Sequence, residues 1–384
     1  MSPARSASHR RALAWTAAIA VPLLAGAAVV VPMAASGAVD LPDKTVEELL
    51  EFAAASDVDA MSGTIAQSSE LGLPDFGGLM GSENDRGPGA ESTPADIEDF
   101  IALATGTHTA NVFLDGERAR LQVLDTLAER NVYLDGEAEE AWYVDSETQT
   151  ATRFTLSSDA DPEQYGMDEK PDEVQTPDQV MDDALARLDE TTEVTVGTDA
   201  LVAGREVYEL VLAPRTEDTL VGELRFAVDG ETGVALAASI TARGASAPAF
   251  EIAFSRVSFD APDAASLTFT PGDDIAVVEE EIPLPTPDEW AQGHSKGAQA
   301  DAAAPTVVGE GWSAVVELSG TGESEGLQGL DTEQLQMLDA ITSAVDGGRV
   351  LQTSLLTVLI TDDGRVLAGA VPADRLVEVA QTGR

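Results

Sequence analysis

Residues 202–228 read VAGREVYELVLAPRTEDTLVGELRFAV, and apolar and polar side chains alternate in both halves of this stretch. Alternation with a period of two predicts β-strands that have one apolar face and one polar face. The same pattern returns in residues 249–259. The apolar face of these three strands carries Tyr208, Leu210, Leu212, Leu224, Phe226, Val228, Phe250, Ile252 and Phe254. Such a face has to be covered by helices, by a second sheet or by a ligand.

Outward from this stretch, many strand-like segments alternate with a few helical ones. A capping box formed by Thr45 and Glu48 predicts a helix over 46–55, and further helices are expected over 94–105 and 177–189. Strands are expected over 62–71, 107–114, 119–124, 131–134, 141–144, 150–156, 193–196, 205–212, 221–228, 234–243 and 249–259. The predicted fold class is therefore α+β, with an antiparallel meander that helices interrupt.

The chain has 384 residues, with 69 Asp and Glu against 21 Lys and Arg, so its net charge is -48, and it contains no Cys. The charge argues against nucleic acid as a partner, because binding to phosphates needs a basic surface. The lack of Cys excludes disulfides, zinc–thiolate sites, thiol nucleophiles and the acylated Cys of a lipoprotein. The acidity itself is typical of a highly soluble protein.

Motifs of catalysis are missing from the sequence, including the common nucleotide-binding, zinc-protease and serine-hydrolase signatures. His9, His108 and His294 lie in separate segments and are not expected to form a metal site or a triad. Acidic residues near 57–59 and 159–163 lack the Gly and the Glu of a calcium loop. We therefore expect a protein that is not an enzyme and that holds no metal or cofactor.

The first 38 residues have the features of an export signal. Arg5, Arg10 and Arg11 precede an uncharged stretch over 12–39, and Ser36-Gly37-Ala38 fits a small-residue cleavage site. The uncharged stretch is also long enough to span a bilayer as an uncleaved anchor. Both interpretations place the rest of the chain outside the cytoplasm, either secreted or anchored to the cytoplasmic membrane.

Residues 283–305 contain several prolines and an Ala-, Gly- and Gln-rich stretch, which is typical of a linker. This linker would separate a large unit, 39–282, from a small α+β unit, 306–384. In the small unit we expect a strand over 306–318, a helix over 332–345, a hairpin of 349–360 with 365–370, and a final helix over 372–380. A unit of about 80 residues is near the lower limit for an independent core, which favours docking on the large unit.

Three segments contain more specific patterns. Residues 202–215 match V-x-G-R-x-x-Y-x-L-x-L-x-P, residues 228–236 approach V-D-x-x-T-G-x-P-L with Ala235 in place of Pro, and residues 254–270 approach F-x-x-V-x-F-x-x-P…F-x-F-x-P. In this order they resemble the LolA-like lipoprotein-carrier superfamily, which includes the MucB/RseB N-terminal domains. The resemblance covers residues 39–278, and the long segment 72–94 is an insertion relative to it.

The resemblance implies a curved, unclosed antiparallel half-barrel covered by helices, with a hydrophobic cavity for lipid or the acyl chains of lipoproteins, and it implies no catalysis. The residues expected to line the cavity are Trp142, Val144, Phe154, Leu156, Tyr208, Leu210, Leu212, Leu224, Phe226, Val228, Leu236, Ile240, Phe250, Ile252 and Phe254. A mobile lid is expected to include Phe76, Leu79, Met80, Ile97, Phe100 and Ile101. The other interpretation of the same apolar face is a packed core without a cavity, and the lid segment then has no role.

A second hypothesis, which the MucB/RseB side of the resemblance implies, is an envelope sensor that binds a membrane protein. The small unit would then supply the contact surface, with Leu351, Leu355, Leu356, Val358 and Ile360 beside Trp312. An exposed apolar patch on that unit would favour this hypothesis.

Overall fold

The computed structural model describes residues 41–72, 105–124, 128–138, 140–156, 176–186, 188, 190–282, 306–318 and 341–382. The N-terminal segment, the expected linker and the lid residues Phe76, Leu79, Met80, Ile97, Phe100 and Ile101 lie outside these ranges. Within them, no helix combines the length and the apolar composition that crossing a membrane requires.

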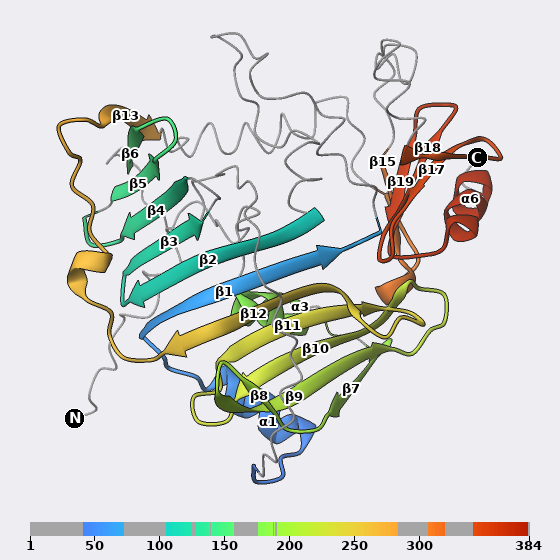
Figure 1. Cartoon of the computed structure of the whole chain (residues 1–384). Helices are drawn as coiled ribbons and strands as arrows, with labels where there is room; N and C mark the ends of the chain where they lie inside the picture. The colour runs from blue at the N-terminus through green and yellow to red at the C-terminus, as the bar shows by residue number, and fades with distance from the viewer. Residues whose placement is uncertain are drawn as a thin grey trace, which may run out of the picture.

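The described chain is mostly β-strand, with few helices, and its strands form two sheets (Figure 1). The large sheet contains β1 (Ala60–Glu70), β2 (Thr105–Asp115), β3 (Arg118–Leu124), β4 (Glu129–Asp135), β5 (Glu140–Asp145), β6 (Thr150–Leu156), β7 (Thr192–Val196), β8 (Ala200–Val202), β9 (Arg205–Pro214), β10 (Val221–Asp229), β11 (Ala235–Ala242), β12 (Pro248–Ser258) and β13 (Ala276–Ile282). Its order is β13-β6-β5-β4-β3-β2-β1-β12-β11-β10-β9-β7, and β8 pairs with β9. The sheet is unclosed, with β13 and β7 at its two ends.

The predicted antiparallel meander is confirmed for most of this sheet. Strands β1 to β6 follow one another in space, as do β9 to β12, and β1 joins the two series by pairing with both β2 and β12. The prediction is wrong at one edge, because β13 pairs parallel to β6. The chain reaches β13 from β12 at a distance across the sheet, and a strand that arrives by such a crossover is not held antiparallel by a tight turn.

Two of the helices predicted in the large unit are confirmed. In α1 (Val46–Ala54) the Thr45 hydroxyl accepts from the Glu48 N–H at 3.2 Å, and the Glu48 carboxylate accepts from the Thr45 N–H at 2.8 Å. In α3 (Pro177–Ala186) Thr176 and Gln179 form the equivalent reciprocal pair of bonds. Each pair satisfies N–H groups that the first turn of a helix leaves open, which is why both helices begin where the sequence predicts.

A glycine lets the two halves of the large sheet meet. Gly63 of β1 lies under the ring of Phe254, and a Cβ at this position would approach both that ring and the Arg256 carbonyl oxygen to 2.6 Å. The register between β1 and β12 shifts by one residue next to it, between Thr64 and Ile65. This bulge brings Phe254 onto the face of the sheet that Ile65 also occupies.

The second sheet is antiparallel and has the order β14-β15-β19-β18-β17-β16. Its strands are β14 (Thr306–Val308), β15 (Val315–Leu318), β16 (Ser343–Val345), β17 (Gly348–Gln352), β18 (Thr357–Thr361) and β19 (Val366–Gly369). Helix α6 (Ala373–Thr382) packs on one of its faces. A separate buried cluster results, formed by Val315, Val350, Leu359, Leu367, Val371, Leu376, Val379 and Ala380.

Several details of this sheet differ from the predictions. A short helical turn, Gly311–Ser313, breaks the strand expected over 306–318. Residues 343–345, expected at the end of a helix, form β16. The strand expected over 349–360 is two strands, because the Thr353 hydroxyl accepts from the N–H groups of Leu355 and Leu356 and closes a turn. That turn contains neither Gly nor Pro, the usual signals, so the apolar run conceals it.

The second sheet docks on the first. The Trp312 indole donates to the Thr192 hydroxyl at 2.9 Å, and the Thr219 hydroxyl donates to the Ala370 carbonyl at 2.7 Å. Trp312 and Leu355 also pack against the apolar core of the large sheet. The partner surface proposed from sequence therefore needs correction, because these two residues face the large sheet instead of a partner.

Candidate ligand-binding face

The apolar residues of the large sheet line up across neighbouring strands. Leu210 pairs with Phe226, Phe226 with Ala238, and Ala238 with Ile252. Directly opposed residues of antiparallel strands point to the same side of the sheet, so these four form one row on one face. A parallel row consists of Leu212, Leu224, Ile240 and Phe250. We call the face that carries both rows the inner face.

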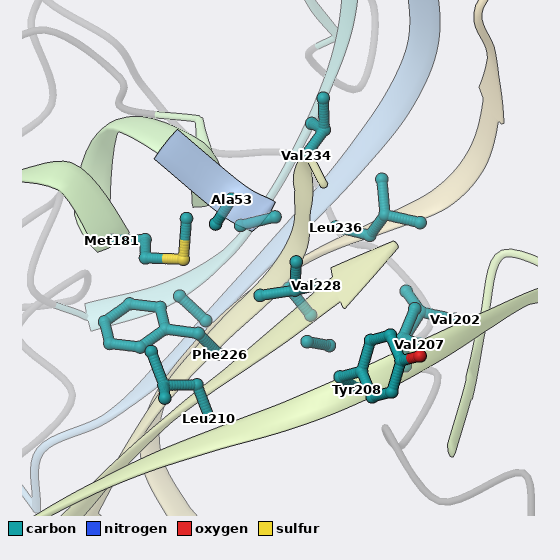
Figure 2. Close-up of a cluster of buried hydrophobic side chains, with 14 of the residues drawn as sticks. Ala53, Met181, Val202, Val207, Tyr208, Leu210, Phe226, Val228, Val234 and Leu236 are labelled. Atoms are coloured by element: carbon teal, nitrogen blue, oxygen red, sulfur yellow. The ribbon is translucent and has the colours of Figure 1, made fainter. Parts of the chain in front are cut away.

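Helices α1 and α3 cover this face over β7, β9 and β11. Ala53 of α1 and Met181 of α3 belong to the same buried cluster as Phe226, and Figure 2 shows them on one side of the strands. Nine of the residues expected to line a cavity are at most 8% exposed here: Tyr208, Leu210, Leu212, Leu224, Phe226, Val228, Leu236, Ile252 and Phe254. Ile240 and Phe250 are half-buried against the same cluster. Other residues of the chain therefore cover nearly all the surface of these side chains.

The residues just before α1 cover one end of the buried apolar cluster. The Tyr208 hydroxyl donates to the Pro42 carbonyl at 2.9 Å, and the Tyr208 ring meets the edge of the Phe52 ring with centroids 6.4 Å apart. The Lys44 ammonium lies 4.7 Å from the centroid of Phe52 and 5.5 Å from that of Tyr208. Burial, together with the charges of Asp199 and Asp43, raises the pKa of Tyr208, so the phenol stays a donor to Pro42 at neutral pH.

The inner face continues beyond this core onto β3–β6. Gly63 of β1 pairs with Val112, Val112 with Leu121, Leu121 with Val132, and Val132 with Tyr143. A second cluster lies here, in which Val132 and Ala141 are buried and Leu121, Leu134, Tyr143 and Phe154 are half-buried. We call these six residues the β3–β6 patch. It is separate from the cluster that α1 and α3 cover.

The structure does not bring together all the residues expected on one lining. Trp142 pairs with Arg153, whereas Phe154 pairs with Ala141, so Trp142 and Phe154 point to opposite faces. Val144 lies on the side of Trp142, and the side chain of Leu156 is outside the described part. The expectation of a single lining is wrong for Trp142 and Val144, because the register of two strands cannot be derived from the alternation within each of them.

Trp142 has a different environment on the opposite, outer face. Its ring packs against Phe269 with centroids 5.2 Å apart, and Glu140 accepts from its indole N–H. The Arg153 guanidinium lies 5.8 Å from the indole centroid and pairs with Glu140 at 2.6 Å. Since Phe269 follows β12 in the chain, this stack holds the crossover toward β13 against the outer face.

Charged side chains also concentrate on the outer face. Arg225 pairs with Glu209 at 2.9 Å and with Glu223 at 2.8 Å. Burial raises the pKa of Glu209, and the Arg225 guanidinium opposes that rise. Within the described residues, no group of three or more His, Cys, Asp or Glu side chains could hold a metal ion. The inner face therefore offers contact with apolar groups, whereas the charges of the outer face pair with one another.

Two polar residues of the inner face are not predicted from the sequence. Gln67 of β1 lies opposite Ile252 on one side and His108 on the other, and Ser69 lies opposite Phe250. Both are 7% exposed. The buried positions of β1 alternate from Ile65 through Gln67 to Ser69, as expected for a strand. The sequence of β1 is rich in Ser and Thr on both faces, however, so it does not indicate which face is buried.

Several solved structures match this chain. The chain is similar in structure to MucB. A structure of MucB in complex with MucA(peri) matches with 15% identity, 87% of this chain and 96% of that chain covered, and a TM-score of 0.39. The Pseudomonas aeruginosa MucA/MucB complex matches with 15% identity, 86% and 95% coverage and a TM-score of 0.39. A LolA superfamily protein from Nitrosomonas europaea matches with 11% identity, 59% and 99% coverage and a TM-score of 0.22.

These matches are to proteins of the kinds that the sequence resemblance names. No protein-family model and no curated protein matches the chain.

Proposed function

We propose that this chain is a non-enzymatic, extracytoplasmic binding protein that holds lipid, or the acyl chains of lipoproteins, on the inner face of its large sheet. The observation that carries the proposal is the β3–β6 patch. Its residues continue the apolar inner face, and four of them are only half-buried, in contrast to the enclosed cluster under α1 and α3. An acyl chain laid along the patch would contact these four side chains.

The energetics of such binding are favourable. Each buried methylene of a ligand contributes about 0.8 kcal/mol, so burial of about ten contributes about 8 kcal/mol before the cost of association is subtracted. A micromolar dissociation constant corresponds to about 8 kcal/mol after that cost. Burial of about fifteen methylenes, about 12 kcal/mol, reaches this range without a charged contact if association costs about 4 kcal/mol. This suits an inner face that is apolar and a protein whose net charge would repel an anionic head group.

Replacing Tyr143 and Phe154 together with alanine is expected to weaken the binding of an uncharged acyl ligand about 10- to 100-fold, because it removes two of the four half-buried side chains of the patch. The measurement is displacement of a fluorescent monoacylglycerol from the purified protein at 25 °C, supported by native mass spectrometry of the bound lipid.

The matched control is Trp142→Ala, which removes a neighbouring aromatic ring that points to the outer face. Its affinity should stay within about 2-fold of the wild-type value, provided that thermal unfolding shows the variant to be folded at 25 °C. Equal losses in both variants would mean that the patch is not the binding surface. A wild-type protein that neither binds the probe nor carries lipid would end the proposal.

A second function, binding of a membrane protein by a sensor, is favoured by the second sheet. Val307, Val316 and Leu318 are 61%, 38% and 49% exposed. Val307 pairs with Val316, Val316 with Ala368, and Ala368 with Val358, so these residues share the face opposite the cluster under α6. This face includes Val358 from the surface proposed from sequence, without Trp312 and Leu355.

Changing Val307 and Val316 to aspartate is expected to abolish any partner capture by this face, because two buried carboxylates would disfavour an apolar contact. Detergent-solubilised membranes would be passed over the immobilised full chain, and the retained proteins identified by mass spectrometry. Val277→Asp with Val278→Asp is the matched control, since these valines of β13 are 45% and 50% exposed on the other sheet. A retained protein set that is identical for all three forms would argue against a sensor.

A further inference from the structure

The large sheet ends at β13, and the outer edge of this strand is open among the described strands. β13 pairs with β6 on one side, and no other described strand pairs with it (Figure 1). The Ala276 N–H donates to the Gln149 carbonyl at 3.0 Å, so Ala276 points its backbone groups toward β6. Backbone groups alternate in direction along a strand, and those of Val277, Glu279 and Glu281 therefore face the outer edge. Such a row of donors and acceptors is a template for a further strand.

The inner face of the sheet reaches this edge. Tyr143 of the β3–β6 patch pairs with Thr152, and Thr152 pairs with Val278. Paired residues of neighbouring strands point to the same side of a sheet, so Val278 continues the row of Val132 and Tyr143. Val278 is 50% exposed, and its neighbour Val277 is 45% exposed. The row that carries the patch therefore runs from the buried part of the sheet to its open edge.

The length of this row is close to that of an acyl chain. From Leu121 on β3 to Val278 on β13 the row crosses four strand spacings. At about 4.8 Å each, these spacings add up to about 19 Å. An acyl chain that fills one leaflet of a bilayer reaches about 15 Å, half the thickness of the hydrocarbon core. A chain that lies along the row therefore has one end close to the open edge, and the group attached to that end lies beside β13.

The charge of β13 indicates which attached group suits the edge. Residues 279–281 are three consecutive glutamates, and the side chain of Glu279 is 78% exposed. They disfavour an anionic membrane surface, and they also disfavour β13 of a second copy, which would place glutamates opposite glutamates. An extended peptide with Lys or Arg side chains avoids both repulsions, and its main chain supplies hydrogen-bond partners for the edge.

We infer that the outer edge of β13 binds an extended, basic peptide segment of an acylated protein as an additional strand, next to the acyl chain. This inference rests on the proposed function, because it gives a place to the polypeptide whose acyl chain lies on the β3–β6 patch. It favours lipoproteins over free lipids as ligands, since a glycerol head group has no main chain that could pair with the edge.

The experiment compares three probes with the same acyl chain: 1-palmitoylglycerol, a palmitoylated peptide of alternating Lys and Val residues, and the same peptide with every amide N-methylated. Binding to the full chain is measured by competition with a fluorescent monoacylglycerol. The unmodified peptide should bind about 10-fold more tightly than its methylated form, because only the unmodified peptide can pair as a strand. The two peptides carry the same charge, so general attraction to the acidic chain cancels in this comparison.

Val277→Pro tests the edge itself. The substitution removes an outward N–H and places a ring on the edge, and edge strands tolerate proline where the N–H faces away from the neighbouring strand. The preference for the unmodified peptide should fall from about 10-fold to below about 3-fold, whereas the affinity for 1-palmitoylglycerol should stay within about 2-fold. Val277→Ala is the matched control, because it keeps the N–H and should keep the preference. Thermal unfolding checks that both variants are folded.

Capture from solubilised membranes gives a second readout. Val277→Asp with Val278→Asp, the control for the second sheet, should reduce the acylated proteins among those retained, because it adds negative charge to the edge and to the end of the apolar row. A partner of the second sheet should remain bound to this variant.

Equal affinity of the wild type for the two peptides would overturn the inference and leave the proposed function standing. A preference that Val277→Pro leaves unchanged, or that Val277→Ala abolishes, would also overturn it. A wild-type protein that binds none of the three probes would instead contradict the proposed function itself.

Discussion

Phe226→Ala is expected to lower the free energy of unfolding by about 3–5 kcal/mol. Phe226 is 1% exposed and lies in the row formed with Leu210, Ala238 and Ile252, under helix α3. Removal of its ring loses the transfer free energy of the buried atoms and leaves a cavity that strands paired on both sides cannot close. Chemical denaturation followed by circular dichroism measures the change.

The control for this variant is Leu318→Ala, which truncates a side chain that is 49% exposed in the second sheet. Its effect should stay below about 1 kcal/mol, because about half of the removed surface already contacts water. A loss below about 1.5 kcal/mol for Phe226→Ala would show that the inner face under α3 is loosely packed.

Asp229→Ala is expected to destabilise the chain by about 3–5 kcal/mol, because it leaves the Arg205 guanidinium without its main partner. Asp229 lies at the end of β10, its side chain is 1% exposed, and it pairs with Arg205 at 2.5 Å. One of its carboxylate oxygens also accepts from the N–H groups of Glu231 and Thr232 and from the Thr232 hydroxyl. The substitution therefore breaks both an ion pair and the β10–β11 turn.

Glu231→Ala provides a control within the same network. Glu231 pairs with the same Arg205 at 2.7 Å, but its side chain is 82% exposed. Exposed ion pairs contribute at most about 1 kcal/mol, so this variant should unfold nearly as the wild type does. Similar losses for both variants would show that the carboxylate of Asp229 has no special role.

The free energy of unfolding should also depend on pH differently in the wild type and in Asp229→Ala. Burial disfavours the charged form of Asp229, but hydrogen bonds from Arg205 and Thr232 outweigh it and hold the pKa below the ordinary value of 3.8. The contribution of this carboxylate is therefore fully present above pH 3.8 and is lost as the pH falls through the pKa of the folded state. Over that acidic range, denaturation curves of the wild type should converge toward those of Asp229→Ala.

Local signals predicted much of the fold. The capping box at Thr45 and the Thr176–Gln179 pair specified where α1 and α3 begin. In the sequence, Asp115-Gly116 and Asp135-Gly136 are typical hairpin turns, and each joins two paired strands of the large sheet. The alternation in 202–228 identified the apolar face, on which Leu210 and Phe226 pair directly. Each of these features depends on residues close together in the chain, and short-range interactions decide them.

Features that depend on distant residues could not be derived in this way. The turn at Thr353 lies within an apolar segment that has no turn signal in its sequence. The parallel pairing of β13 with β6 joins residues that lie more than a hundred positions apart. The separation of Trp142 from Phe154 follows from the register between β5 and β6. One residue of shift in that register would exchange the two faces.

The sequence by itself therefore determined that this chain is an acidic, cysteine-free protein, rich in antiparallel strands with one apolar face, because composition and period are properties of the chain alone. Only the tertiary structure decided which part of that face α1 and α3 enclose, which part forms the half-buried β3–β6 patch, and that Gln67 and Ser69 lie on the inner face. The physical reason is that burial is a property of pairs of elements. The alternation of apolar and polar residues is a property of the strand's own sequence, but the elements that cover each face of the strand come from elsewhere in the chain.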